Sequence, residues 1–332
     1  MTIGRISSIF GGLCVFLLVV GLIPGTVLAE DKVYQIGIST IATHPALDAA
    51  RNGFIDEMAA QGFEEGKNVA YELTNAEGDM SLAASIAKKF VSQKKDMILA
   101  ITTPISQACV AAAKNTDIPI VFNSVTDPVA AGIVASWEKP GGLVTGASDW
   151  MDVEHQVRLM KEIYPSVKKV GVIFNAGEVN SQVQVGELKK AVAKLGIEKV
   201  VEANVATTAD VLLTTKSLVG RVDAIWFPTD NVVVAALEAV VKVCEDNQIP
   251  LFGSDPNQVQ RGVIACSGVS MYDVGRESGK MAARILNGEK PADIPVTKGV
   301  MSELAVNPSA ARRMGVTIPE TVMAKATEVV DK

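Results

Sequence analysis

Short polar loops follow the predicted strands at five places in this sequence. An apolar run over residues 118–122 leads into Ser124, Thr126 and Asp127, and Pro128 then ends the strand. In an open parallel sheet the carboxyl ends of the strands line the crevice where ligands bind, and unpaired N–H groups beside them suit anions. The same residue types also cap helices without contacting a ligand. Their recurrence nevertheless predicts a cleft site. The loops cover residues 102–107, 124–127, 175–181, 229–231 and 254–255.

Residues able to catalyse reactions are scarce in this sequence. His44 and His155 are its only histidines, which leaves no histidine-rich metal site, and no Gly-x-Ser-x-Gly turn occurs. The segment 275–281 superficially resembles a phosphate-binding loop. It has one residue too few between its glycines, and Met281 stands where a Ser or Thr would bind magnesium. We therefore predict a binding protein without a cofactor or metal, and an exported enzyme is the disfavoured alternative.

The composition favours an acidic, globular chain. Hydrophobic residues make up 48% of it, enough for a large core, and the length suits two domains. A formal net charge of −6 makes nucleic acid and anionic membrane surfaces poor partners. Cys109, Cys244 and Cys266 stand in apolar contexts without paired spacing, which predicts buried thiols, although one disulfide stays open in an oxidising compartment.

Residues 1–29 are typical of a secretory signal peptide. Arg5 precedes an uncharged, mostly apolar run, and residues 27–29 (Val-Leu-Ala) form a small-residue cleavage pattern. An uncleaved membrane anchor is the alternative. We expect export to the periplasm.

Strand-like apolar runs alternate with helix-like runs from residue 33 onward, which favours parallel βαβ units. A glycine-containing stretch over 141–150 interrupts the pattern, which then begins afresh. Trp226 stands in mid-strand and is predicted to be core. A helix is expected at the C-terminus. The predicted strands cover residues 34–40, 68–74, 97–101, 118–122, 169–174, 224–227, 250–252, 263–269 and 302–306.

Motifs spread over nearly the whole chain after residue 29 resemble one known family. They are residues 44–48 (His-Pro-Ala-Leu-Asp), 103–104 (Thr-Pro), 122–128 (Phe-Asn-Ser-Val-Thr-Asp-Pro), 180–181 (Asn-Ser), 228–231 (Pro-Thr-Asp-Asn) and the tail 306–319. In their order and spacing they resemble the tryptophan/tyrosine-type substrate-binding proteins of ABC uptake transporters.

This resemblance implies the type I periplasmic binding protein fold. That fold is α/β, with two doubly wound parallel-sheet lobes joined by three hinge strands. The N-terminal lobe would comprise residues 33–147 plus about 273–300, and the C-terminal lobe residues 148–272 plus about 301–332. Crossings are expected near 146–150, 270–273 and 297–304. The ligand would bind between the lobes, and hinge closure would present the closed form to the permease.

Characterised members of the family bind aromatic amino acids, so the resemblance implies a small zwitterionic ligand of that class. The expected donors to its α-carboxylate are Thr102, Thr103, Ser106, Ser124 and Thr126. Asp230 or Asp255 in the other lobe would accept from its α-ammonium. The remaining predicted site residues are Asp127, Asn180 and Ser181, with Trp150, Phe174 and Tyr272 as aromatic cover.

Some alternatives stay open at this point. The aromatic fraction of the chain is only 5%, so few rings are available to contact a ligand. A small aliphatic or hydroxylated ligand, or a solute other than an amino acid, is therefore an alternative. The expected partners are the small-molecule ligand and an ABC permease in the inner membrane, and we expect a monomer. A periplasmic sensor that signals to a membrane receptor is the alternative function.

Overall fold

The computed structural model describes residues 1, 2, 4 and 32–331. The predicted signal peptide therefore lies, apart from three residues, outside the described residues. Val33–Lys332 forms one compact unit built on two sheets, each covered by helices. Among the described residues, no helix is long and apolar enough to cross a membrane.

The first sheet has the strand order β11-β5-β4-β3-β1-β2, and all of its pairings are parallel. Its helices are α1 (Pro45–Ala60), α2 (Met80–Ser92), α3 (Thr103–Ala113) and α9 (Met271–Leu286). Its strands are β1 (Tyr34–Thr40), β2 (Val69–Asn75), β3 (Met97–Ile101), β4 (Ile120–Asn123), β5 (Val144–Ser148) and β11 (Thr297–Lys298).

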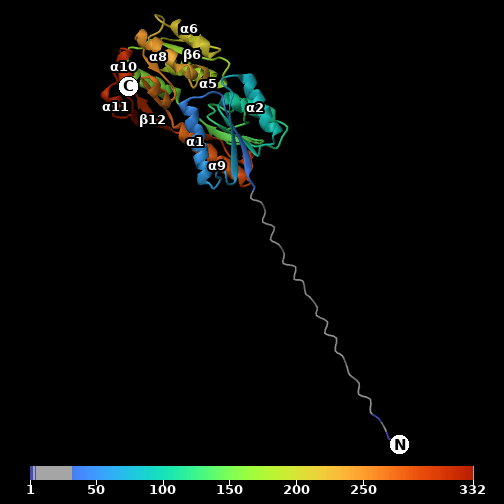
Figure 1. Ribbon diagram of the computed structural model, residues 1–332. Helices are drawn as coiled ribbons and strands as arrows, with labels where there is room; N and C mark the ends of the chain where they lie inside the picture. Colours follow the sequence, from blue (N-terminus) through green and yellow to red (C-terminus); the bar gives the residue numbers. More distant parts are fainter. Residues whose placement is uncertain (3, 5–31, 332) are drawn as a thin grey trace. The chain divides into compact units, whose positions relative to one another are not determined.

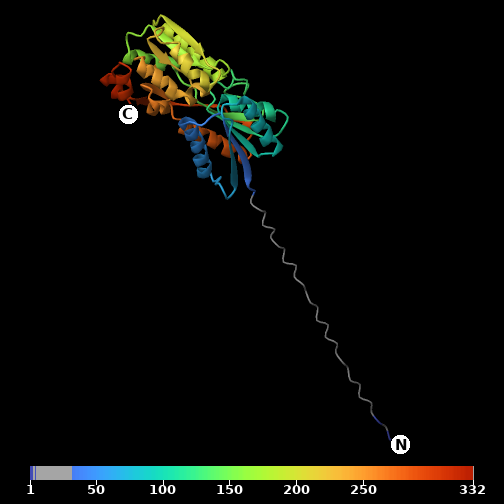
Figure 2. The same cartoon turned by 45° about the horizontal axis from the view of Figure 1, so that its top comes forward.

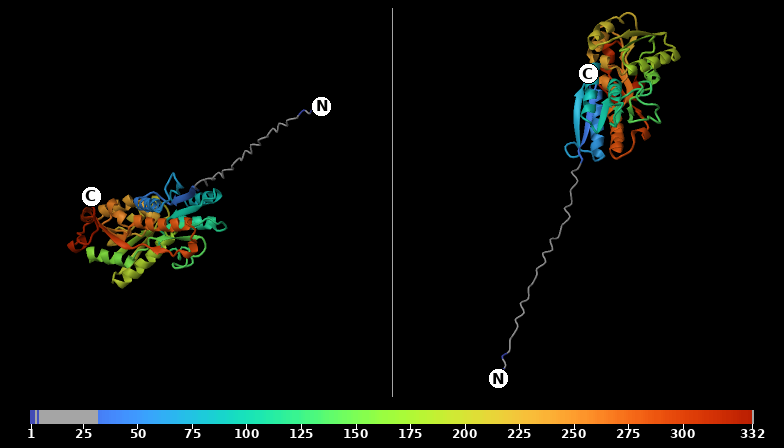
Figure 3. Two further views of the ribbon diagram at one scale, coloured as in Figure 1. Left: turned by 90° about the horizontal axis from the view of Figure 1, so that it is seen from below. Right: turned by 90° about the vertical axis from the view of Figure 1, so that its right-hand side faces the viewer.

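The second sheet has the order β13-β12-β10-β9-β8-β6-β7. Its strands are β6 (Lys169–Phe174), β7 (Lys199–Asn204), β8 (Ala224–Trp226), β9 (Leu251–Phe252), β10 (Ala265–Val269), β12 (Met301–Val306) and β13 (Glu328–Val329). Its helices are α4 (Val153–Ile163), α5 (Val179–Lys194), α6 (Val211–Lys216), α7 (Asn231–Ala235), α8 (Leu237–Asp246), α10 (Pro308–Arg313) and α11 (Glu320–Met323), with 3-10 turns at η1 (Thr208–Asp210) and η2 (Pro256–Arg261). Figure 1 shows α1, α2 and α9 in one region of the unit and α5, α6 and α8 in another. Figure 2 and the two views of Figure 3 show the same ribbon from further directions.

Central strands in both sheets are buried along their whole length, as β3 and β4 are in the first sheet. Because helices cover both faces of such a sheet, its strands are continuous apolar runs without polar alternation. Trp226 on β8 is fully buried, as predicted. Cys109, Cys244 and Cys266 are free and buried, and burial raises the pKa of the Cys109 thiol to about 12.

Two expectations differ from the structure. The sheets are not wholly parallel, because β12 pairs antiparallel with β10 after the chain returns to the second sheet. The single helix expected at the C-terminus is divided into two short helices, α10 and α11, and strand β13 follows them. Gly315, at φ +78°, ends the first helix, and Pro319 precedes the second.

The chain passes between the two sheets three times. It crosses over residues 149–152 between β5 and α4, at Ser270 between β10 and α9, and over residues 299–300 between β11 and β12. Two α/β lobes joined by three crossings make the type I periplasmic binding protein fold, and this prediction is confirmed. The lobe boundaries given above stay a prediction.

Helices α1 and α9 pack at very close range and lie side by side in Figure 1. A Cβ atom at Gly275 would collide with the carbonyl oxygen of Ala50, and one at Gly53 with that of Tyr272. Glycine at these positions lets two helix backbones approach more closely than side chains would allow. This close packing holds α9, which begins directly after the second crossing, against α1.

Candidate functional site

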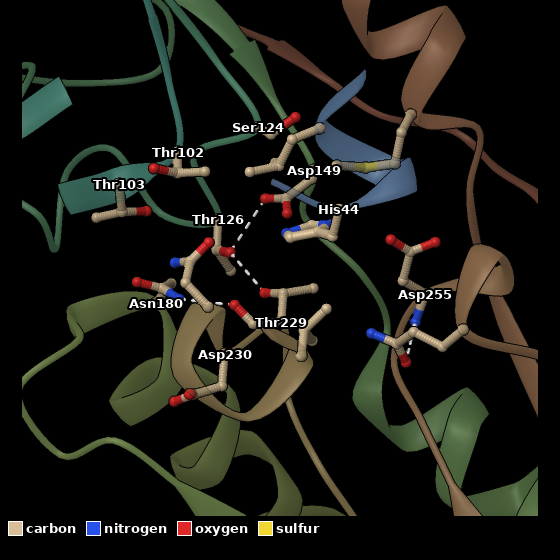
Figure 4. A pocket seen from close by; sticks show the side chains of 15 residues that line it. His44, Thr102, Thr103, Ser124, Thr126, Asp149, Asn180, Thr229, Asp230 and Asp255 are labelled. Atoms are coloured by element: carbon tan, nitrogen blue, oxygen red, sulfur yellow. Dashed lines mark hydrogen bonds between the residues drawn. The ribbon is translucent and has the colours of Figure 1, made fainter. Parts of the chain in front are cut away.

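A cavity lies where the strand-end loops of the two lobes meet (Figure 4). Small-molecule sites in proteins are typically concave, with a few convergent polar groups. Most of its lining residues are polar, and the apolar ones are Leu47, Val234 and Met271. The lining residues are His44, Leu47, Thr102, Thr103, Ser124, Thr126, Asp149, Asn180, Thr229, Asp230, Asn231, Val234, Asp255, Gln258 and Met271.

The N-terminus of α3 contributes hydroxyl groups to one side of this cavity. Thr102 and Thr103 are buried, and among the described residues neither hydroxyl has a hydrogen-bond partner. Thr102 has φ +89°, a left-handed value that costs energy in a residue with a Cβ. Such strain clusters at ligand sites, and a helix N-terminus favours negative charge. This corner is therefore suited to a carboxylate.

Two carboxyl groups face the cavity without a positive partner. Asp149 and Asp255 are both buried, and no Lys or Arg is among the described residues that line the cavity. Asp149 accepts a hydrogen bond from Thr126 Oγ1 at 3.0 Å, and Asp255 accepts one from the backbone N–H of Asn257 at 2.9 Å. Burial, and then the charge of Asp255, raises the pKa of Asp149 to about 6. Burial also raises the pKa of Asp255.

His44 lines the same cavity but does not neutralise these carboxyl groups (Figure 4). Burial, followed by the nearby charge of Arg261, lowers the pKa of His44 to about 4. The imidazole is therefore uncharged at neutral pH. The cavity carries a net negative charge, which favours a ligand with a positive group.

Asp230 lines the cavity, but its carboxylate already has partners in its own lobe. Oδ2 accepts from the backbone N–H of Asn175 and from Ser181 Oγ, both at 2.6 Å, while Oδ1 caps α7 through the N–H of Val233 at 2.9 Å. In Figure 4 the carboxyl group points away from the centre of the cavity. Its role in the structure is to hold the loops of the second lobe together.

Three predicted polar residues do not line the cavity. Ser106 is buried within α3, where its hydroxyl donates to the carbonyl of Thr102 at 2.7 Å. Asp127 caps the turn that follows it through the N–H groups of Val129 and Ala130, both at 3.0 Å. Ser181 donates to Asp230, as described above. All three satisfy backbone or carboxylate groups that strand-end loops leave unpaired.

None of the three predicted aromatic rings lines the cavity either. Phe174 packs in the core of the second lobe. Tyr272 is exposed and donates to Asp56 at 2.7 Å. Trp150 packs edge-to-face on Trp137, with ring centroids 6.4 Å apart. The predicted residues that do line the cavity are Thr102, Thr103, Ser124, Thr126, Asn180, Asp230 and Asp255.

Sequence reasoning missed several lining residues. Asp149 directly follows strand β5, and this strand-end position was a signal that could have identified it. Gln258 follows Asp255 in η2, and its Oε1 accepts from the N–H of Ser254 at 3.1 Å. The apolar residues Leu47, Val234 and Met271 carried no signal, because each also fits the buried face of its helix.

The two lobes touch directly at the cavity. Thr126 Oγ1 of the first lobe lies 3.4 Å from Thr229 Oγ1 of the second. Asn180 Nδ2 donates to the carbonyl of Thr229 at 2.8 Å, and Gln184 Oε1 accepts from its N–H at 2.8 Å. These bonds fix the loop that carries Thr229. Among the residues that the structure describes, no cluster of His, Cys, Asp and Glu could hold a metal ion.

The fold and this cavity between the lobes define a class of small-molecule binding proteins. The family model for ABC transporter substrate binding proteins matches residues 35–330, and this chain belongs to that family. The tyrosine-binding protein of Clostridioides difficile is 42% identical to it over 278 residues, which cover 84% of this chain and 80% of the relative. Family and relative are substrate-binding proteins, which confirms the prediction that the chain is not an enzyme.

Two solved structures bear on the arrangement of the lobes. An ABC domain from Streptococcus pneumonia in complex with L-Trp has 33% identity and a TM-score of 0.86, covering 90% of this chain and 100% of that chain. A ligand-free, open substrate binding protein from Clostridium difficile has 40% identity at the same coverage, but a TM-score of only 0.68. This chain therefore superposes better on the ligand complex than on the open structure, although the open structure is closer in sequence.

Proposed function

We propose that this protein is the exported solute-binding component of an ABC uptake transporter, and that it binds an aromatic L-amino acid between its lobes. The observation that carries the proposal is the pair Asp149 and Asp255, two buried carboxyl groups without a cationic partner in the cavity lining. The two relatives are a tyrosine-binding protein and a protein in complex with L-Trp, which supports the ligand class.

The charge of the cavity selects for an amine. A buried carboxylate without a partner is costly, because burial removes its hydration. An ammonium group between Asp149 and Asp255 offsets this cost through charge-assisted hydrogen bonds. Asp230 does not compete for the amine, since its oxygens accept from Asn175, Ser181 and Val233.

The α-carboxylate of the zwitterion fits the N-terminus of α3. The hydroxyls of Thr102 and Thr103 have no partner among the described residues. A ligand α-carboxylate there would gain hydroxyl donors and the favourable end of the helix dipole. The carboxylate would thus bind to the first lobe, while the amine contacts Asp255 of the second. Such a ligand joins the lobes and favours the closed form.

The side chain of the ligand would contact Leu47, Val234 and Met271. A methionine thioether packs favourably against aromatic rings. No Phe, Tyr or Trp is among the described residues that line the cavity, and this observation favours an aliphatic amino acid as the second candidate. Both candidates share the amine and carboxylate, so the two assignments at Asp149 and at α3 hold for either.

Calorimetry on the chain from residue 30 onward, unfolded and refolded to remove carried ligand, tests the proposal. We expect L-tyrosine, L-tryptophan or L-phenylalanine to bind. Tyramine, which lacks the carboxylate, and 3-(4-hydroxyphenyl)propionate, which lacks the amine, should each bind at least about tenfold more weakly than L-tyrosine. Tighter binding of leucine or valine would move the ligand to the aliphatic class. Equal binding of the amine-free analogue would contradict the role of the carboxyl pair.

A further inference from the structure

Thr126 contacts the first crossing and the opposite lobe at the same time. Its hydroxyl donates to Asp149 Oδ1 at 3.0 Å, and its carbonyl accepts from Ser148 Oγ at 2.9 Å. The same hydroxyl lies 3.4 Å from that of Thr229 in the second lobe. Thr126 is almost wholly buried, so water does not replace these contacts in the closed form.

The chemistry of the groups gives these hydrogen bonds a direction. An ionised carboxylate only accepts, so the single proton of the Thr126 hydroxyl is directed to Asp149. The oxygen of Thr126 is then free to accept from the Thr229 hydroxyl. Thr229 Oγ1 also lies 3.2 Å from Gln184 Oε1, which is an acceptor in its own lobe. The hydroxyl proton of Thr229 therefore has two acceptors within reach, Thr126 Oγ1 across the cleft and Gln184 Oε1 within the second lobe.

We propose that Thr126 is a positioning residue that links the ligand's amine at Asp149 to closure of the lobes through Thr229. This inference rests on the proposed function, because it takes the amine to bind at Asp149. An ammonium group beside Asp149 holds the ionised carboxylate in place as the acceptor of the Thr126 hydroxyl. Thr126 is thereby fixed with its lone pairs toward Thr229, and the contact across the cleft is strengthened when the ligand is bound.

Replacing the hydroxyls by methyl groups tests this link. Thr126→Val and Thr229→Val keep the shape of each side chain and remove its hydrogen bonds. A matched control is Thr215→Val, since Thr215 is fully buried within α6 and donates only to the carbonyl of Val211, at 2.7 Å. Affinity for L-tyrosine is measured by calorimetry. Closure is measured as the distance between spin labels on Lys88→Cys in α2 and Lys190→Cys in α5, two exposed positions in different lobes.

We expect Thr126→Val to weaken binding by about tenfold and to leave part of the ligand-saturated protein at the longer, open distance. Thr229→Val should act in the same direction, and the double variant should lose less than the sum of the two single losses, because both changes remove the contact between Thr126 and Thr229. Thr215→Val should stay within about twofold of the unchanged protein. Losses that simply add in the double variant, or full closure with unchanged affinity in Thr126→Val, would overturn the proposal.

The variant Asp149→Asn removes the negative charge of Asp149 but keeps an acceptor for the Thr126 hydroxyl. The amide oxygen still accepts from Thr126, so affinity should fall while the ligand-saturated distance stays closed. If the unchanged protein binds no amino acid, the proposed function fails. The distance between the spin labels then still tests whether Thr126 holds the lobes together. In that case Thr126→Val must lengthen the distance in the ligand-free protein, and an unchanged distance would overturn the closure role as well.

Discussion

Ser181 Oγ and Asp230 Oδ2 lie 2.6 Å apart at the N-terminus of α7. With the N–H groups of Asn175 and Val233, this contact makes Asp230 a structural carboxylate of the second lobe. We predict that Asp230→Ala lowers the free energy of unfolding by about 3 kcal/mol, because it leaves several buried donors without an acceptor. Urea denaturation measures this loss. Asp127→Ala, which removes a half-buried turn cap, should cost about 1 kcal/mol. Unchanged stability in Asp230→Ala, together with lost ligand binding, would return Asp230 to the binding site.

Replacing Asp255, unlike replacing Asp230, should weaken ligand binding without lowering stability. Burial raises its pKa, so its charged form is unfavourable in the ligand-free fold. We predict that Asp255→Asn weakens binding of L-tyrosine by more than about tenfold and leaves the unfolding midpoint the same or higher. Calorimetry and thermal denaturation of one preparation give both values. Asp152→Asn, at the cap of α4 and outside the cavity lining, is the control and should leave affinity unchanged.

Affinity should depend on pH through Asp149. Its pKa of about 6 in the ligand-free protein means that it is ionised above pH 6 and protonated below. An ammonium ligand favours the ionised form, so binding should weaken as the pH falls through 6, by up to about tenfold per unit. Calorimetry from pH 5 to pH 8 measures this slope. In Asp149→Asn the slope should be smaller, and an identical slope would assign the titration to another group.

The stability of the ligand-free protein should change with pH in the opposite sense. The pKa of Asp149 is raised on folding, so its contribution is present below about pH 4 and is lost as the pH rises through 6. The shift from an ordinary value of 3.8 corresponds to about 3 kcal/mol. Glu178, whose pKa burial raises to about 7, titrates nearby and changes stability in the same direction. The difference between the unchanged protein and Asp149→Asn at each pH isolates Asp149.

The contact between α1 and α9 should tolerate no added methyl group. Gly275→Ala would place Cβ against the carbonyl of Ala50, and we predict a loss of about 2 kcal/mol in unfolding free energy. Gly186 lies within α5 with open space around its Cβ position, so Gly186→Ala should stabilise by up to about 1 kcal/mol. Chemical denaturation of the two variants measures both changes in unfolding free energy, which should have opposite signs. Equal effects would mean that the helices adjust their spacing freely.

The fold could be predicted further than the site. Buried parallel strands such as residues 97–101 are apolar runs with clear ends, and the structure has β3 at these residues. The site could be predicted only as far as the loops. Ser106, Ser181 and Asp127 have the residue types of ligand contacts. Ser106 and Asp127 instead bond to backbone groups of their own segments, and Ser181 bonds to Asp230 on another loop of its lobe. Side-chain direction within a loop depends on local hydrogen bonds that spacing does not reveal.

A crystal structure of the chain from residue 30 onward with L-tyrosine is the most direct test of the central claim. We expect the ligand in the cavity of Figure 4, with its amine about 3 Å from the carboxyl oxygens of both Asp149 and Asp255 and its carboxylate at Thr102 and Thr103. A complex with the amine at Asp230, or with the ligand outside this cavity, would contradict the role assigned to the carboxyl pair.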